Sequence, residues 1–381
     1  MPTISKCAFR LILVLSLCSV VLDTTRAYAA PGTGRGCAGV DARGLDRLFA
    51  GQVGRVAGAD YIRPYVLPNG NSLMLMQDVF LSSSSSAVVR SLDRAKFVHN
   101  AAVLLDRRGC VVRTLSGSRG YLGGNLTRNL SRWFWAMGGA MGADGRLHVL
   151  VAELRNPNGT GAATGATPVG TWHATIDPRS LAVLSFVRAA DASADLFGWA
   201  VASDGDFTYL YAHCYRQFVP GELLGHDLSC ANQVRVARVP LGRLELRPEY
   251  FTGDGWSADA SRAAPIDFAG ERTINPVSIQ NINGTFVSVS KEGDWWGTTI
   301  FVDTASAATG PWTTVASLKP PTKCFACNTY YASLMPWRQP DGSLVVALSN
   351  NAWDMRAVAY PRPWIYRNSF IAIALQRPIH A

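Results

Sequence analysis

The residues of this sequence that could do chemistry are carboxylates at the ends of predicted strands. Asp60 enters a first apolar strand, and Asp78 closes the strand that follows it. Two carboxyl groups that flank one bond can act as proton donor and as base or nucleophile, as cleavage of a glycosidic bond requires. Aspartates at strand ends also cap turns, so both interpretations stay open for this pair.

Aromatic side chains at other strand ends could contact a sugar, because the apolar face of a sugar ring stacks on an aromatic ring. The candidates for substrate contact, with one further carboxylate, are Trp135, Trp199, Glu292 and Tyr330. The alternative is that the rings fill gaps between sheets and that Glu292 belongs to a polar turn.

The elements that would position these residues are β-hairpins. Five times, an apolar strand leads through an Asn-Gly or Asp-Gly turn into a second apolar strand, and such turns accept the positive φ of tight hairpins. The turn glycines lie 75, 60, 79 and 58 residues apart, at Gly70, Gly145, Gly205, Gly284 and Gly342. Each interval can hold a four-stranded sheet. The period predicts an all-β, five-bladed β-propeller, in which strand ends converge on one funnel. A β-sandwich, the alternative, usually has turns every 8–12 residues or so and lacks this longer period.

The chain begins with a predicted signal peptide over residues 1–30. Lys6 and Arg10 precede an apolar run, Leu11 to Leu22, and Ala27-Tyr28-Ala29 has the small-x-small pattern of a cleavage site. We therefore expect a secreted or cell-envelope protein. An N-terminal tail over residues 31–56, with a short helix near Asp41 to Leu48, would precede one propeller domain over residues 57–381.

Six cysteines remain after the predicted cleavage, and an even number in an oxidising compartment indicates disulfides. Proximity in sequence favours Cys214–Cys230 and Cys324–Cys327, which leaves Cys37–Cys110. The Cys-x-x-Cys pair could also be a zinc knuckle or a redox pair. A structural disulfide is favoured because a second zinc-ligand pair and a following helix are both missing from the pattern.

Charge and composition limit the partners. The full chain has a net charge of +9, and its basic residues are scattered, which argues against a nucleic-acid surface. No stretch after the signal is apolar and long enough to span a membrane. The six histidines occur singly, so we expect no metal and no cofactor, although an axial calcium ion is compatible with a small propeller. We expect a monomer whose partner is a polysaccharide.

A set of short motifs resembles a known family. They appear in the order Gly58-Ala59-Asp60, Asp78-Val79-Phe80, Phe97-Val98-His99-Asn100, Trp133-Phe134-Trp135, Gly253-Asp254-Gly255-Trp256-Ser257 and Thr309-Gly310-Pro311-Trp312. In this order they resemble a family of secreted actinobacterial proteins, long catalogued as a domain of unknown function, that includes endo-D-arabinanases.

The resemblance implies a five-bladed propeller that hydrolyses D-arabinofuranose chains of arabinogalactan or lipoarabinomannan. It implies that Asp60 and Asp78 are the catalytic pair. It also implies that His99 and Asn100 lie near the funnel, where they would orient a carboxylate or a sugar hydroxyl.

Two positions depart from the family pattern. Gln77-Asp78-Val79-Phe80 replaces Gly-Asp-Thr-Phe, and the Trp-Pro-Gly-Asp motif is replaced by Trp135-Ala136-Met137-Gly138-Gly139, which lacks the acid. The second departure would fit another linkage preference, or a propeller that binds glycan without cutting it. A purely structural or protein-binding propeller is a third hypothesis, and no sequence feature supports it.

Overall fold

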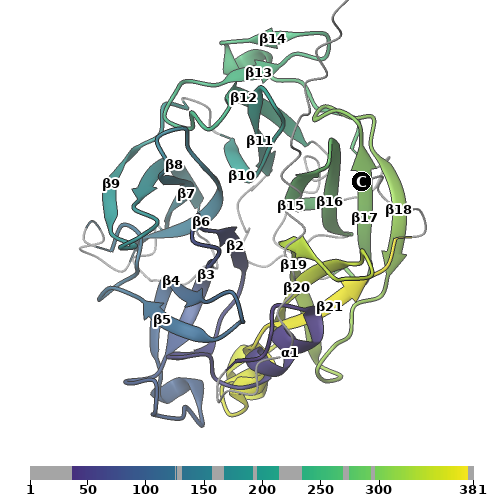
Figure 1. Cartoon of the computed structure of the whole chain (residues 1–381). Helices are drawn as coiled ribbons and strands as arrows, with labels where there is room; N and C mark the ends of the chain where they lie inside the picture. Colours follow the sequence, from purple (N-terminus) through teal and green to yellow (C-terminus); the bar gives the residue numbers. More distant parts are fainter. Residues whose placement is uncertain are drawn as a thin grey trace, which may run out of the picture.

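The protein is a five-bladed β-propeller in the computed structural model, which describes residues 37–124, 126, 131–156, 167–191, 195–213, 234–268, 274–292 and 297–375. Its five antiparallel sheets are arranged around a central axis (Figure 1). This architecture confirms the predicted fold class. The predicted signal peptide and the Cys214–Cys230 bridge lie outside the described residues.

The strands follow the chain blade by blade. Blade 1 comprises β1 (Val56–Gly58), β2 (Ile62–Val66), β3 (Ser72–Leu81), β4 (Lys96–Leu105) and β5 (Val111–Leu115). Blade 2 comprises β6 (Arg132–Met141), β7 (Leu147–Arg155), β8 (Thr167–Ile176) and β9 (Val183–Arg188). Blade 3 comprises β10 (Leu196–Ser203), β11 (Phe207–His213), β12 (Arg235–Pro240), β13 (Glu249–Phe251) and β14 (Trp256–Ser257).

The last two blades complete the ring. Blade 4 comprises β15 (Ile274–Ile282), β16 (Thr285–Glu292), β17 (Ile300–Ala305) and β18 (Thr313–Leu318). Blade 5 comprises β19 (Cys327–Arg338), β20 (Leu344–Ala352) and β21 (Ser369–Ile373). The helices are α1 (Ala42–Ala50) and the short η1 (Leu92–Arg94), η3 (Ala260–Arg262), η5 (Met355–Ala359) and η6 (Pro363–Tyr366).

The five predicted turns all join the innermost strand of a blade to the next strand. They connect β2 to β3, β6 to β7, β10 to β11, β15 to β16 and β19 to β20. Four of the five turn glycines have the positive φ that the pattern predicts, and Gly205 is the exception. The innermost strands β2, β6, β10, β15 and β19 lie around the centre of the ring (Figure 1).

The hydrophobic core lies between neighbouring blades, because both faces of each sheet are covered. Successive side chains of a strand point to opposite faces. Leu73 and Leu75 accordingly pack toward blade 2, and Met74 and Met76 pack toward blade 5. Because both faces are buried, the strands appear in the sequence as continuous apolar runs.

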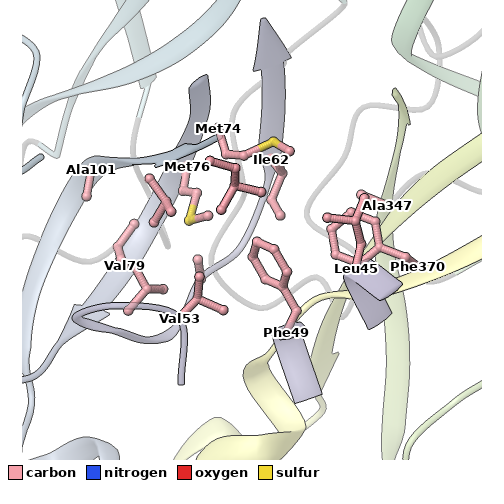
Figure 2. Close-up of a cluster of buried hydrophobic side chains, with 14 of the residues drawn as sticks. Leu45, Phe49, Val53, Ile62, Met74, Met76, Val79, Ala101, Ala347 and Phe370 are labelled. Carbon is pink, nitrogen blue, oxygen red and sulfur yellow. The ribbon is translucent and has the colours of Figure 1, made fainter. Parts of the chain in front are cut away.

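Helix α1 closes the ring by joining the N-terminal segment to blade 5. Asp41 caps the helix through a 2.7 Å hydrogen bond from the Gly44 amide. Figure 2 shows Leu45 and Phe49 in the cluster that blade 1 shares with blade 5. The Phe49 and Phe370 ring centroids lie 4.9 Å apart. The Phe370 amide of β21 donates a 2.9 Å hydrogen bond to the Asp46 carboxylate. Blades 1 and 5 are thus held together by contacts of α1 with β21.

We expect Phe49→Ala to lower the free energy of unfolding by about 3–5 kcal/mol, because the change leaves a cavity where the helix closes the ring. Urea titration followed by tryptophan fluorescence measures the loss. Arg47→Ala, on the exposed side of the same helix, is the matched control and should change stability by less than about 0.5 kcal/mol. Equal effects of the two changes would contradict this role of Phe49.

Two of the three predicted disulfides are present. Cys37–Cys110 joins the N-terminal segment to blade 1, and Cys324–Cys327 closes a short turn before β19. The predicted pairing is confirmed for these four cysteines. Among the described residues, no helix is both long and apolar enough to cross a lipid bilayer.

Candidate active site

The two predicted aspartates stand opposite each other at a break in the innermost ladder of blade 1. Gly58 of β1 pairs with Phe80 of β3, and Ile62 of β2 pairs with Met76. Three residues on each strand separate these regular ladders, and Asp60 and Asp78 are the middle residues. The fold therefore brings together the pair that the sequence analysis selected.

The backbone at this break is irregular. Asp78 has a φ of +44°, a conformation that non-glycine residues rarely adopt. The Asp60 amide donates a 2.9 Å hydrogen bond to the Gln77 carbonyl oxygen, and the Gln77 amide donates to the Tyr61 carbonyl oxygen at 3.0 Å. Strained conformations of this kind often occur at functional sites, where the surrounding structure holds them.

Asp78 is arranged as a hydrogen-bond acceptor. Its Oδ1 atom lies 2.8 Å from His99 Nδ1 and accepts a 3.0 Å hydrogen bond from the Trp135 indole nitrogen. An indole N–H can only donate, so this oxygen is an acceptor. An ionised carboxylate there requires the proton of the imidazole to be on Nδ1. The Asp78 side chain is 13% exposed, so part of it can be reached from solvent.

Asp60 is more deeply buried and is held from blade 5. The Ser349 hydroxyl donates a 2.6 Å hydrogen bond to its Oδ1 atom. The Asn368 side-chain amide donates a 2.7 Å hydrogen bond to its backbone carbonyl oxygen. The side chain and the backbone of Asp60 are thus held by residues 289 and 308 positions away in the chain.

The environments of the two carboxyl groups differ. Burial, and next the negative charge of Asp78, raise the pKa of Asp60 well above its ordinary value. The Ser349 hydrogen bond and the positive charge of Lys291 lower the pKa of Asp60 and offset only part of this shift. Lys291 is itself buried and donates a hydrogen bond to the Thr329 carbonyl oxygen.

Such a pair can divide proton donation and proton acceptance. Two nearby carboxyl groups whose pKa values are pushed apart are the usual arrangement for acid–base chemistry. The raised pKa favours a protonated Asp60, whereas Asp78 is held as a hydrogen-bond acceptor by the Trp135 indole.

Aromatic rings surround the Asp78 side. The His99 ring stacks on Trp133, with centroids 4.6 Å apart and an angle of 14° between the rings. The Phe97 and His99 rings meet edge to face, with their centroids 4.9 Å apart. Trp135 is only 5% exposed and holds Asp78 through its indole nitrogen. The structure thus gives Trp135 a contact that positions a carboxylate, while its contact with a substrate stays a prediction.

Two other predicted contact residues lie in the core. Trp199 is fully buried, and its ring stacks with Tyr61. Asn100 is 2% exposed, and its side-chain amide bonds the backbone of Leu122 and Phe134. Because both side chains are buried, a sugar in the funnel would not reach them. In this structure both residues serve packing between blades. The side chains of Glu292 and Tyr330 lie outside the described residues.

The residues near the axis do not fit a calcium ion. The buried Arg63 side chain donates hydrogen bonds to the Ala136 and Trp199 carbonyl oxygens, at 2.9 Å and 2.5 Å. Its guanidinium carbon lies 4.3 Å from the centre of the Tyr61 ring. Arg63 belongs to blade 1 and contacts blades 2 and 3, and its positive charge would repel a cation near the axis. Within the described ranges, no three histidine, cysteine or acidic side chains are placed to hold a metal.

The missing acid after Trp135 has a steric explanation. A Cβ atom on Gly138 would lie 2.6 Å from a Val201 methyl group, and one on Gly139 would lie 2.3 Å from the His148 carbonyl oxygen. Both glycines line a cavity of about 410 Å³ to which all five innermost strands contribute. Neither Asp60 nor Asp78 lines this cavity. The close neighbours of Gly138 and Gly139 therefore leave no room for a side chain at either position.

His99 and Trp135, which hold the Asp78 carboxyl group, were among the predicted site residues, but other residues around the pair were not. Besides Ser349, Asn368 and Lys291, these include Tyr366, whose hydroxyl donates a 3.2 Å hydrogen bond to the Asp78 carbonyl oxygen. All four come from blades 4 and 5 or from the loop between β20 and β21. No local pattern marks them, since serine, asparagine and tyrosine are common at strand ends.

Comparison with known proteins supports the fold. Residues 45–374 match a family described as "Domain of unknown function (DUF5005)". Among curated proteins, none matches this sequence. A proposed hydrolase from Bacteroides ovatus ATCC 8483 superimposes with a TM-score of 0.64 at 16% identity, over 86% of this chain and 88% of that one. A GH43_1 enzyme from Xanthomonas citri superimposes with a TM-score of 0.50 at 13% identity, over 85% and 91% of the two chains. At these identities the likeness concerns the fold.

Proposed function

This chain belongs to the DUF5005 family, and from that premise and the geometry of the carboxyl pair we propose that it is a glycoside hydrolase. The observation that carries the proposal is the pairing of Asp60 with Asp78 across the break in blade 1, where burial raises the pKa of Asp60 and where His99 and Trp135 hold the Asp78 carboxyl group. The similar fold of a GH43_1 enzyme supports the reaction class.

In the proposed mechanism, Asp60 holds the proton that is given to the leaving oxygen of the glycosidic bond. Asp78 acts as the base that activates water or as the nucleophile. His99 and Trp135 hold Asp78 in its acceptor state, and Ser349 orients Asp60. The charge of Lys291 keeps the pKa of Asp60 from rising further.

The proposed substrate is a furanoside polysaccharide of the cell wall, with D-arabinan of arabinogalactan or lipoarabinomannan as the first choice. The ordered motifs from Gly58-Ala59-Asp60 to Thr309-Gly310-Pro311-Trp312 support this choice. Cleavage within the chain and action outside the cell belong to the same proposal. The signal-like N-terminus supports the location.

Digestion of purified arabinogalactan with the protein that lacks residues 1–30 tests the proposal. We expect soluble oligosaccharides of several lengths, resolved by chromatography with mass detection. Xylan and galactan serve as control substrates for specificity. Retention of the protein on arabinogalactan without any released product would contradict hydrolysis and favour a propeller that only binds glycan.

A further inference from the structure

Four exposed aromatic rings belong to segments that meet at one buried cluster. Of the described phenylalanines and tryptophans, only Phe97, Phe325, Trp353 and Trp364 are more than one third exposed. Phe325 is completely exposed, and Trp353 is 57% exposed. The other large rings in this part of the chain are buried or half-buried, so the four exposed rings form a distinct set, which we call the aromatic rim.

The aromatic rim lies over one buried cluster, whose members include Phe80, Cys327, Ala352, Ile365 and Tyr366. Phe325 lies between Cys324 and Cys327, Trp353 follows Ala352, and Trp364 precedes Ile365. Phe97 pairs with Phe80 across the β3–β4 ladder, with ring centroids 5.1 Å apart. Four segments that are distant in sequence thus meet over the same core.

Hydrogen bonds join the three segments that carry the outer rings. The Trp353 amide donates a 3.2 Å hydrogen bond to the Ala326 carbonyl oxygen. The Lys323 ammonium group donates a 2.9 Å hydrogen bond to the Trp364 carbonyl oxygen. The Cys324–Cys327 disulfide closes the turn that carries Phe325. The backbone under these rings is therefore constrained before any ligand arrives, which lowers the entropic cost of binding.

The aromatic rim is continuous with the carboxyl pair. Phe97 contacts His99, and His99 bonds Asp78. At the other side of the cluster, the Tyr366 hydroxyl bonds the Asp78 backbone carbonyl. A chain whose scissile bond lies at Asp78 can therefore extend from Phe97 over the surface of this cluster toward the outer rings.

We propose that the aromatic rim binds the part of a polysaccharide chain that extends beyond the bond to be cut. This inference rests on the proposed function and deepens it, since it identifies a long glycan chain as the preferred ligand. Each ring offers a flat apolar face for one sugar unit. Continuity with the carboxyl pair favours a glycan chain over a lipid surface as the occupant.

Binding measurements in the Asp78→Asn background test this inference without hydrolysis. We expect Phe325→Ala with Trp353→Ala to weaken the binding of arabinogalactan roughly tenfold. The binding of a short arabinan oligosaccharide should weaken much less, because it does not reach the outer rings. Isothermal titration calorimetry with both ligands gives the two ratios.

Leu184→Ala with Val187→Ala is the matched control, because both residues are exposed on β9 at the outer edge of blade 2. This control should bind arabinogalactan like its parent. Unchanged arabinogalactan binding by the rim variant, or no binding by the parent, would overturn the inference. So would loss of binding to phosphatidylcholine–phosphatidylglycerol vesicles in the rim variant with arabinogalactan binding unchanged. If the unmutated protein releases no product but the rim variant loses arabinogalactan binding, the hydrolase proposal fails and the rim remains a glycan site.

Discussion

Asp78→Asn is expected to reduce the rate of glycan hydrolysis by at least about a thousandfold while the protein stays folded. The asparagine side-chain oxygen can still accept the hydrogen bonds from His99 and Trp135, so the local structure is kept. It cannot act as a base or nucleophile at neutral pH. Loss of acid–base catalysis alone costs about 10²- to 10⁴-fold, and loss of a nucleophile costs more.

Initial rates of reducing-sugar release, together with circular dichroism and thermal unfolding, measure this effect. Asp93→Asn is the matched control, because Asp93 is an exposed carboxylate in η1 of the same blade. It should keep full activity. An Asp78→Asn protein as active as the Asp93→Asn protein would remove Asp78 from the mechanism.

The second large effect concerns Asp60 and the pH dependence of stability. The folded-state pKa of Asp60 is raised, so the folded protein binds more protons than the unfolded chain between the ordinary pKa and the raised one. Stability must therefore fall as pH rises through this window. Each unit by which the pKa is raised corresponds to about 1.4 kcal/mol at pH values above the window.

Asp60→Asn should remove this contribution, because the amide stays neutral at every pH. We expect the variant to be more stable than the parent above the window, and to lose hydrolysis because it cannot donate a proton. Urea denaturation at a series of pH values between 4 and 8 compares the slopes. Parallel stability curves for Asp60→Asn and its parent would show that the carboxyl group is not perturbed in the folded protein.

The pH dependence of activity should follow the same group. If Asp60 donates the proton, hydrolysis declines as pH rises through its raised pKa. Initial rates of reducing-sugar release at a series of pH values should therefore fall on the alkaline side, and a rate that stays constant through that range would contradict proton donation by Asp60.

The sequence by itself determined the local elements of this protein. Asn-Gly and Asp-Gly turns between apolar runs specify hairpins because they accept the tight-turn backbone, and all five predicted hairpins are present. Their spacing indicated five blades. A short helix was expected near Asp41 to Leu48, where α1 lies, and short sequence separation favoured the Cys324–Cys327 bridge. Each of these signals depends on neighbouring residues only.

The tertiary structure alone decided how the carboxyl pair is held and which aromatic rings are exposed. Ser349 and Asn368 reach Asp60 because the ring closes between blades 5 and 1. Trp199 lies within β10 and is fully buried, whereas Trp353 directly follows β20 and is exposed. The physical reason is that burial and hydrogen bonding here arise between blades, from segments up to about 300 residues apart. No periodicity along the chain records those distances.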